Sequence, residues 1–379
     1  MDQNGWKVHT DRNQANDSMN ISCNTCGSAF DYKQMYYLCP KCGGIFDINN
    51  FPVIDLGKIE VNRPGLMRYL EHFGLNPENE PISLGEGGTR LIEDEYRSRK
   101  VFHKMESLNP TGSYKDRGTV VLINYLRQNG IETVVEDSSG NAGASFAAYA
   151  AMAGIKARIF IPESASGSKR KQIEDFGAEL VMIPGPRANA ARAVRAEADS
   201  GVVYASHAYM PMGLLGIATI AFEIFEATAE DINSVIIPIG HGGLMLGIMR
   251  GYISLLEGGY IHRLPKFIGV QAALCSPVAN LLSPIANNGI DTQTTIAEGV
   301  RVTDPVRGQA VADLIKMNNG MIIRVDEEMI LPAFNELKER GIDVEPTSAL
   351  TWAGLKLLPQ EIEGPVLMVQ TGAGYKYQP

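Results

Sequence analysis

Short apolar runs alternate with longer helical stretches along most of the chain. The apolar runs are rich in valine and isoleucine and have the four to six residues of a buried strand, whereas the longer stretches are alanine-rich or amphipathic. The expected strands are 133–136, 157–161, 180–183, 234–239 and 365–369, and the expected helices are 144–153, 169–176, 188–198 and 244–256. Because strands and helices alternate, the pattern predicts the α/β class, with open, mostly parallel sheets covered by helices on both faces.

Glycine-rich turns follow three of these expected strands. S-S-G-N-A-G (138–143) comes after the first strand, G-H-G-G-L (240–244) after the fourth, and T-G-A-G (371–374) after the last. Ligands of open parallel sheets bind outside the carboxyl ends of the strands. The three turns therefore predict where a ligand binds. Glycine supplies 39 of the 379 residues, an excess that agrees with many tight turns and close backbone approaches.

The charge balance is acidic, because 34 Lys and Arg residues face 43 Asp and Glu residues and the net charge is −9. An acidic chain is not attracted to nucleic acid or to anionic membrane surfaces, so neither partner is expected. No apolar run reaches the length of a transmembrane helix. Residues 1–5 lack the basic and apolar regions that begin a secretory signal. These features predict a cytoplasmic enzyme that acts on a small molecule.

Four of the five cysteines lie in a short N-terminal segment. They form two C-x-x-C pairs separated by twelve residues, and each pair lets two thiolates bind one ion from a tight turn. The four residues are Cys23, Cys26, Cys39 and Cys42. The spacing predicts a structural zinc site in a zinc-ribbon-like segment, residues 20–48. The alternative is a pair of disulfides, which a reducing cytoplasm disfavours. Cys275 stands alone and is expected to be a buried thiol.

The string N-P-T-G-S-Y-K-D-R-G (109–118) carries a candidate catalytic lysine. Lys115 follows a Pro–Gly turn and begins an apolar helix, so its amine can be held rigidly beside a ligand. Removal from water and neighbouring cations make a lysine side chain nucleophilic toward aldehydes. On these residues alone, the alternative is a solvated lysine at the start of a surface helix.

This string is similar to the lysine motif of fold-type II pyridoxal-phosphate enzymes, and most similar to that of threonine synthases. Three further segments resemble the same family in the same order: L-G-E-G-G-T-R-L (84–91), S-S-G-N-A-G (138–143) and E-P-T-S-A (345–349). The two C-x-x-C pairs also resemble the ribbon of many prokaryotic threonine synthases. The resemblance implies a two-lobed catalytic unit over residues 51–379, with a smaller lobe near 120–215, and a homodimer.

The resemblance also implies pyridoxal 5'-phosphate as the cofactor. Lys115 would bond to the cofactor aldehyde and later act as the general base at the substrate α-carbon. Asn141 would hydrogen-bond the cofactor's phenolic oxygen, and Thr371 would face the pyridine nitrogen. Because a hydroxyl group does not hold that nitrogen protonated, elimination and replacement are favoured over transamination. The alternative for Thr371 is an ordinary threonine at the end of a strand.

Two glycine-rich turns would bind the anionic groups of the cofactor and the substrate. The cofactor phosphate would be bound by the backbone N–H groups of Gly240, His241, Gly242, Gly243 and Leu244. In that turn His241 would contribute its backbone rather than act as an acid or base. The substrate carboxylate would be bound by Ser138, Ser139, Gly140, Ala142 and Gly143. From the residues alone, the first turn also fits a dinucleotide, although it lacks the full G-x-G-x-x-G spacing.

The chain departs from threonine synthases where the substrate phosphate would be recognised. Many threonine synthases have N-P-x-R-x-x-G-x-K-T where this chain reads M-P-M-G-L-L-G-I-A-T (210–219). Gly213 stands at the position of the arginine, Ala218 at that of the lysine, and Ala142 at that of a loop threonine. A phosphate dianion in such an apolar pocket would carry a large desolvation cost. Replacement cations could come from Lys169, Arg170, Lys171 and Arg187, unless these belong to a solvated helix face.

Three functions therefore compete. The first is a threonine synthase-like lyase, which would convert O-phosphohomoserine and water to threonine and phosphate. The second is a serine/threonine dehydratase-like or β-replacement enzyme of the cysteine or cysteate synthase kind, which needs no phosphate pocket. G-I-A-T-I-A-F-E-I (216–224) and T-T-I-A-E-G-V (294–300) resemble dehydratases. The third is a ribbon-bearing binding protein without activity. The presence of the lysine, the asparagine and the phosphate loop argues against this third function.

Overall fold

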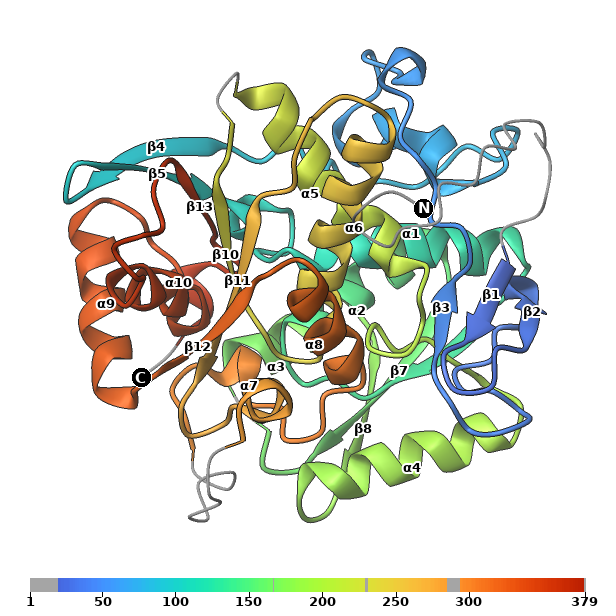
Figure 1. Cartoon of the computed structure of the whole chain (residues 1–379). Helices are drawn as coiled ribbons and strands as arrows, with labels where there is room; N and C mark the ends of the chain where they lie inside the picture. Colours follow the sequence, from blue (N-terminus) through green and yellow to red (C-terminus); the bar gives the residue numbers. More distant parts are fainter. Residues whose placement is uncertain (1–19, 166, 229–230, 285–293, 378–379) are drawn as a thin grey trace.

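The computed structural model describes residues 20–165, 167–228, 231–284 and 294–377. The prediction that residues 1–5 carry no secretory signal lies outside these ranges. Within them, the strands form three separate sheets, and most of the helices pack around the two larger ones (Figure 1).

The larger of the two main sheets has six strands in the order β12-β11-β10-β13-β5-β4. All neighbouring pairs are parallel except β4 and β5, which form an antiparallel edge. The strands are β4 (Leu91–Tyr96), β5 (Arg99–Lys104), β10 (Ser234–Pro238), β11 (Lys266–Ala272), β12 (Met321–Val325) and β13 (Val366–Val369). The associated helices are α6 (Gly243–Glu257), α7 (Pro277–Leu282), α8 (Gly308–Met317), α9 (Glu327–Glu339) and α10 (Pro346–Lys356). In Figure 1, α9 and α10 lie on the opposite side of this sheet from α6.

The second main sheet has four parallel strands in the order β8-β7-β6-β9. Its strands are β6 (Thr133–Glu136), β7 (Lys156–Pro162), β8 (Glu179–Ile183) and β9 (Val203–Tyr204). The helices of this region are α1 (Lys115–Gln128), α2 (Asn141–Ala153), α3 (Ser168–Asp175), α4 (Arg187–Asp199) and α5 (Gly213–Ala227). Short 3-10 helices are η1 (Tyr32–Gln34), η2 (Leu56–Lys58), η3 (Gly65–Phe73), η4 (Glu106–Leu108), η6 (Glu298–Val300) and η7 (Gly374–Lys376).

Helix α5 is predominantly apolar and is buried from Leu214 to Ile224. A helix of this composition is stable only in the interior of a protein. It packs closely against α1 and α6, and the three helices share one hydrophobic core. The beginning of α5 therefore lies in the centre of the molecule.

The N-terminal segment forms a small antiparallel sheet of β1 (Asn20–Cys23), β2 (Ala29–Asp31) and β3 (Phe46–Ile48). It packs against the rest of the chain at several points. The ring of Tyr32 contacts that of Tyr125 in α1 edge to face, with centroids 4.8 Å apart. The carboxylate of Asp47 forms an ion pair with Arg250 of α6. The segment is thus attached to two central helices. The division into a ribbon-like segment (20–48) and a catalytic unit (51–379) with a smaller lobe near 120–215 stays a prediction.

The predicted parallel α/β pattern is confirmed, but helix α2 begins earlier than expected. It starts at Asn141 rather than Ala144, so the asparagine turn is the first turn of a helix. Gly140 has extended backbone angles and ends the preceding loop, and the small Ala142 and Gly143 fit a tight helix start. This matters for binding, because the N–H groups of a first helical turn have no acceptor within the helix.

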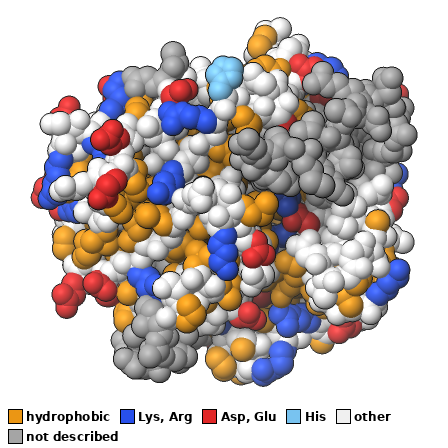
Figure 2. Space-filling model, viewed as in Figure 1, with side chains coloured by type: hydrophobic (Ala, Val, Ile, Leu, Met, Phe, Trp, Pro, Cys, Tyr) orange, Lys and Arg blue, Asp and Glu red, His pale blue; other side chains and the backbone are white. Residues whose placement is uncertain are grey.

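The described surface carries charges of both signs. On the face in Figure 2, basic and acidic side chains are interspersed rather than separated by sign. None of the helices in the described ranges is both long enough and apolar enough to cross a membrane.

Candidate active site

A cavity of about 450 Å³ lies where the strand ends of the two main sheets face each other. Its wall brings together the lysine turn, the asparagine turn, the G-H-G-G-L turn and the end of β13. Among the predicted site residues, the wall includes Lys115, Ser138, Ser139, Gly140, Asn141, Ala142, Gly240, His241, Gly242, Gly243, Leu244 and Thr371. Gly143, the remaining predicted residue, does not line the cavity. A Cβ atom there would be 1.9 Å from the carbonyl oxygen of Ser138, so only glycine lets this turn close.

Lys115 is the first residue of α1 and lines the cavity. The turn before it is pinned by Asp116, whose carboxylate accepts hydrogen bonds from the backbone N–H of Thr111 (2.7 Å) and from its hydroxyl (2.5 Å). The N–H of Tyr114 donates to the carbonyl oxygen of Thr371 (3.0 Å), which joins the turn to the end of β13. The Lys115 Nζ lies 4.8 Å from the centroid of the Tyr114 ring and has no hydrogen-bond acceptor among the described residues. The amine is therefore available to a ligand.

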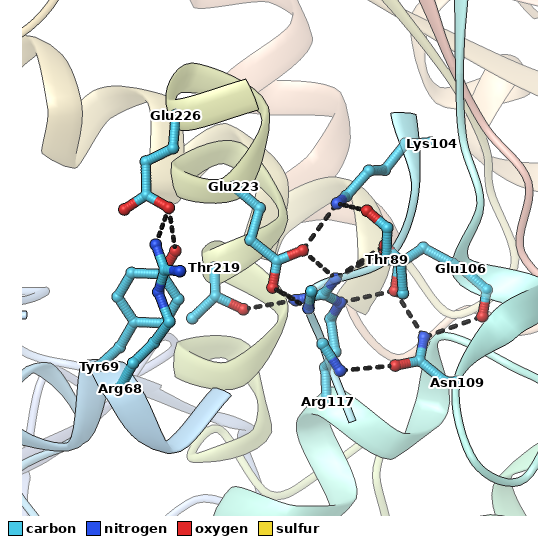
Figure 3. A network of polar contacts seen from close by, with 12 residues as sticks. Arg68, Tyr69, Thr89, Lys104, Glu106, Asn109, Arg117, Thr219, Glu223 and Glu226 are labelled. Carbon is cyan, nitrogen blue, oxygen red and sulfur yellow. Dashed lines mark hydrogen bonds and ion pairs between the residues drawn. The ribbon is translucent and has the colours of Figure 1, made fainter. Parts of the chain in front are cut away.

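Arg117 anchors the same helix through a network of polar contacts (Figure 3). Its guanidinium is fully buried and donates to the carboxylates of Glu106 and Glu223 at 2.6–2.8 Å. Lys104 donates to Glu223 as well (2.7 Å), so two cations face two carboxylates. Burial opposes ionisation of Glu223, but Arg117 and Lys104 outweigh it and lower the pKa of this carboxyl well below its usual value. This neutral network fixes the start of α1 against β5 and α5.

Asn141 connects the two sides of the cavity. Its side-chain nitrogen donates to both carboxylate oxygens of Glu345 at 3.1 Å, and its side-chain oxygen accepts from Lys376 Nζ at 3.1 Å. Burial lowers the pKa of Lys376 to about 8, although Glu345 and Asp116 oppose this shift. Glu345 belongs to the E-P-T-S-A segment, so two of the motif segments meet at Asn141.

The G-H-G-G-L turn leads directly into α6, which begins at Gly243. Gly242 has a φ of 96°, and a Cβ atom there would be 2.8 Å from Val311 Cγ2. Only glycine fits this position. Within the described ranges, the backbone N–H groups from Gly240 through Leu244 have no hydrogen-bond acceptor. These donors at a helix N-terminus suit a phosphate group. Burial, His207 and nearby cations lower the pKa of His241 well below its usual value.

Thr371 places a hydroxyl rather than a carboxylate at the far wall. It is buried, and its Oγ1 lies 3.0 Å from Ser348 Oγ. The Ser348 hydroxyl also accepts a hydrogen bond from the N–H of Gly372 (3.1 Å). The arrangement holds the Thr371 hydroxyl in place beside the cavity.

The candidate cations near α3 and α4 separate into two groups. Lys169 and Arg187 line the cavity, and Lys169 Nζ lies 3.5 Å from the Glu345 carboxylate. Arg170 and Lys171 instead pair with acidic residues one turn further along the exposed face of α3. Arg187 makes no ion pair with any residue that the structure describes. Arg170 and Lys171 thus belong to a solvated helix face, whereas Lys169 and Arg187 lie at the cavity.

Several cavity residues were not predicted from the sequence. Glu136, the last residue of β6, and His207, after β9, line the wall near Lys115. Arg301 follows η6 and also lines it. The position of Glu136 directly before the S-S-G-N-A-G turn is a signal that could have identified it. No local pattern marks His207. The remaining wall beside α5 is apolar and is formed by Met210, Gly213, Leu214 and Ile217.

The four N-terminal cysteines come together as predicted. Their sulfur atoms all lie within 4.8 Å of one another, and none is disulfide-bonded. The Cys23 and Cys42 sulfurs are 3.4 Å apart, and those of Cys26 and Cys39 are 3.7 Å apart. This donor set is compatible with a tetrahedral metal ion. Cys275 is buried, which confirms the expectation for that residue.

The cavity fits pyridoxal phosphate on its own chemistry. An amine without an acceptor, a helix start with free N–H groups and a fixed hydroxyl face the same space, which has the size of a small-molecule site. These three groups match the aldehyde, the phosphate and the ring nitrogen of that cofactor.

Comparisons with known proteins agree with this chemistry. The family described as "Pyridoxal-phosphate dependent enzyme" matches residues 82–372. A threonine synthase of Methanocaldococcus jannaschii is 32% identical over 373 residues, covering 93% of this chain and 92% of the relative. A threonine synthase of Methanosarcina acetivorans is 30% identical over 351 residues, covering 89% and 86%.

Solved structures share the fold. Maize serine racemase aligns with a TM-score of 0.65 at 24% identity, over 76% of this chain and 88% of that chain. The processed form of threonine deaminase isoform 2 from Solanum lycopersicum aligns with a TM-score of 0.63 at 21% identity, over 85% and 90%.

Proposed function

The chain belongs to the family of pyridoxal-phosphate-dependent enzymes and is a lyase of that family, and we propose that it acts on O-phosphohomoserine, forming threonine and phosphate with water. The observation that carries this proposal is the placement of Lys169 and Arg187 in the same cavity as Lys115. They supply cations to a cavity in which Gly213 stands at the position of the threonine synthase arginine, whereas Ala218, at the position of the lysine, is buried and does not line the cavity. The full-length similarity to threonine synthases supports the same conclusion.

When bound, pyridoxal phosphate supplies an electron sink for negative charge on the substrate α-carbon. The residues of this chain would hold that group in a fixed orientation. The free N–H groups from Gly240 to Leu244 would bind its phosphate, Asn141 its phenolic oxygen, and Thr371 its ring nitrogen. Because Thr371 offers a hydroxyl rather than a carboxylate, elimination and replacement are favoured.

The first turn of α2 would orient the substrate. Within the described ranges, the N–H groups of Ser139, Asn141, Ala142 and Gly143 have no acceptor, and they begin a helix. A helix N-terminus of this kind binds a carboxylate through hydrogen bonds and its positive dipole end. Lys115 Nζ would then take the proton from the α-carbon, because its amine has no competing acceptor.

Lys169 and Arg187 would bind the leaving phosphate. A charge-assisted hydrogen bond contributes about 1.5–3 kcal/mol, which corresponds to roughly 10- to 150-fold in affinity. Lys169 also lies 3.5 Å from both Glu298 and Glu345, which position its ammonium group at the wall. Phosphate would leave the γ-carbon, and water would add at the β-carbon.

A second candidate is dehydration of serine or threonine. It is favoured by the apolar wall of Met210, Leu214 and Ile217, which offers no polar group to a phosphate. This reaction needs only the lysine, the cofactor and the carboxylate site.

The test is to incubate the purified holoenzyme with O-phospho-L-homoserine, L-serine or L-threonine in parallel. We expect phosphate and threonine in equal amounts from the first substrate. Lys169→Ala should raise KM for O-phosphohomoserine by roughly 10-fold or more. Lys171→Ala is the matched control, because Lys171 lies on the same helix with its side chain 73% exposed. Keto acid from serine or threonine without phosphate release would instead establish the dehydratase.

A further inference from the structure

We propose that Glu136 and His207 form an acid–base pair that exchanges a proton with the oxygen atom at the substrate β-carbon. The inference rests on the proposed function, because that function identifies the oxygen atom. In the proposed reaction it is the oxygen of the added water. In the dehydratase alternative, the same atom belongs to the leaving hydroxyl group. His207 would be the catalytic residue and Glu136 its positioning residue.

The two side chains are in contact and face the cavity. His207 Nδ1 lies 3.3 Å from Glu136 Oε1, and both residues line the same wall as Lys115. The other carboxylate oxygen of Glu136 accepts the N–H of Ser138, so the carboxylate is fixed from its own loop. The Glu136 side chain is 1% exposed, whereas that of His207 keeps 25%.

We place the second ring nitrogen of His207, Nε2, on the cavity side, because Nδ1 contacts Glu136 and the residue lines the cavity. In the part of the chain that the structure describes, Nε2 has no hydrogen-bond partner, and it is not among the buried polar atoms without one. The ring also contacts that of His241 at nearly a right angle, with centroids 5.8 Å apart. The contact with Glu136 on one side thus leaves Nε2 open to a substrate or water molecule.

Burial displaces the pKa values of both side chains of the pair. Burial raises the pKa of Glu136 to about 7, although the N–H of Ser138, Arg187 and Lys115 each lower it. Burial and the nearby cations lower the pKa of His207 well below its usual value. The titratable and charged groups that face the pair are Lys115, Asp137, Arg187, Tyr204, His241 and Arg307. Two contacting groups with displaced pKa values in a cavity are typical of acid–base sites.

A base other than Lys115 at the β-carbon oxygen leaves the Lys115 ammonium group available to protonate the α-carbon. When water adds to the β-carbon, the water O–H bond breaks and its oxygen bonds to that carbon. The electron pair of the carbon–carbon double bond returns to the α-carbon, where the Lys115 ammonium supplies a proton. Lys115 is then a donor and cannot accept the water proton in the same step. That proton passes to His207 Nε2, while the proton on His207 Nδ1 passes to the Glu136 carboxylate, whose raised pKa suits it as the acceptor. In the reverse direction, the pair returns the proton to a leaving hydroxyl group.

The experiment compares two rates in the holoenzyme. The first is threonine formation from O-phospho-L-homoserine, or keto-acid formation from L-threonine. The second is exchange of the α-proton of L-threonine in D₂O, followed by NMR, which needs Lys115 but no chemistry at the β-carbon. For Glu136→Gln and His207→Gln, we expect turnover to fall at least about 100-fold while exchange stays within about twofold. The double variant should be no slower than the slower single variant, because the two residues act as a unit.

The pH profile and a control variant separate this role from a structural one. The wild-type rate should fall as pH decreases, because the pair must be deprotonated to accept the water proton, and Glu136→Gln should remove this acidic limb. Glu163→Gln is the matched control, since Glu163 follows the neighbouring strand of the same sheet but is exposed. Unchanged turnover in Glu136→Gln, or an equal loss of turnover and exchange, would overturn the pair.

The two proposals can fail separately. An enzyme that dehydrates threonine but ignores O-phosphohomoserine refutes the proposed function, while a roughly 100-fold loss of keto-acid formation in Glu136→Gln still supports the pair. A wild-type enzyme that forms neither product refutes both.

Discussion

Replacing Arg117 by methionine should destabilise the protein strongly. The side chain is fully buried and makes six hydrogen bonds, to Glu106, Glu223, Thr89 and Thr219. Methionine fills a similar space but donates nothing, so two buried carboxylates lose their main cation. Lys104 would still neutralise part of the charge on Glu223.

Removing one partner of a buried ion pair costs about 3–5 kcal/mol, because the remaining charge stays buried without compensation. The control is Arg68→Met. Arg68 pairs with Glu226, one turn along α5 from Glu223, but both side chains of this pair are partly exposed (29% and 27%; Figure 3). Partly exposed pairs contribute at most about 1 kcal/mol. We therefore expect about 4 kcal/mol for Arg117→Met and less than about 1 kcal/mol for Arg68→Met.

The assay is urea unfolding of the cofactor-free protein at pH 8 and pH 5, followed by circular dichroism. In the wild type the pKa of Glu223 is depressed, so its contribution to stability is present above the ordinary carboxyl pKa and is lost as pH falls. Without Arg117 that pKa rises, and protonation at low pH removes the unpaired charge. The deficit of Arg117→Met should therefore be smaller at pH 5 than at pH 8. Equal losses for the two arginine variants, or a deficit that grows at pH 5, would refute the reasoning.

Two further predictions concern the cofactor loop and the cysteines. Gly242→Ala should weaken cofactor binding at least about tenfold, because alanine at a φ of 96° is strained and its Cβ would approach Val311 to 2.8 Å. A cofactor titration followed by absorbance measures this affinity, and an unchanged affinity would contradict the role of the loop. Wild-type protein produced with zinc should hold about one ion per chain, whereas Cys39→Ser should hold none and melt several degrees lower. Metal analysis that finds the same zinc content in both proteins would exclude a four-cysteine site.

The sequence predicts the parts of the fold that depend on local pattern. The runs at β6, β7, β8 and β10 are rich in valine and isoleucine, and these strands form where expected. Strand β4 (L-I-E-D-E-Y) was missed, because acidic residues are unusual in strands and are tolerated here at a sheet edge. Strand β11 was missed as well, although its run F-I-G-V (267–270) is largely apolar.

The residues of the candidate site also fall into those that a local pattern predicts and those that it does not. The turns with Lys115 and Asn141 are recognisable because each carries its chemistry in a few consecutive residues. Glu136 and His207 are 71 residues apart and meet because β6 pairs with β9, a strand order that no local pattern specifies. Likewise, nothing in the sequence alone indicates that Arg117 faces Glu223 of α5, 106 residues away.

The most direct test of the central claim is to trap the cofactor on its lysine. Borohydride reduction of the holoenzyme, followed by peptide mapping with mass spectrometry, should find the cofactor mass on the peptide that contains Lys115. Lys115→Ala should carry no such label and should have lost its activity. A label on Lys169, which lines the same cavity, together with turnover that persists in Lys115→Ala, would contradict the account.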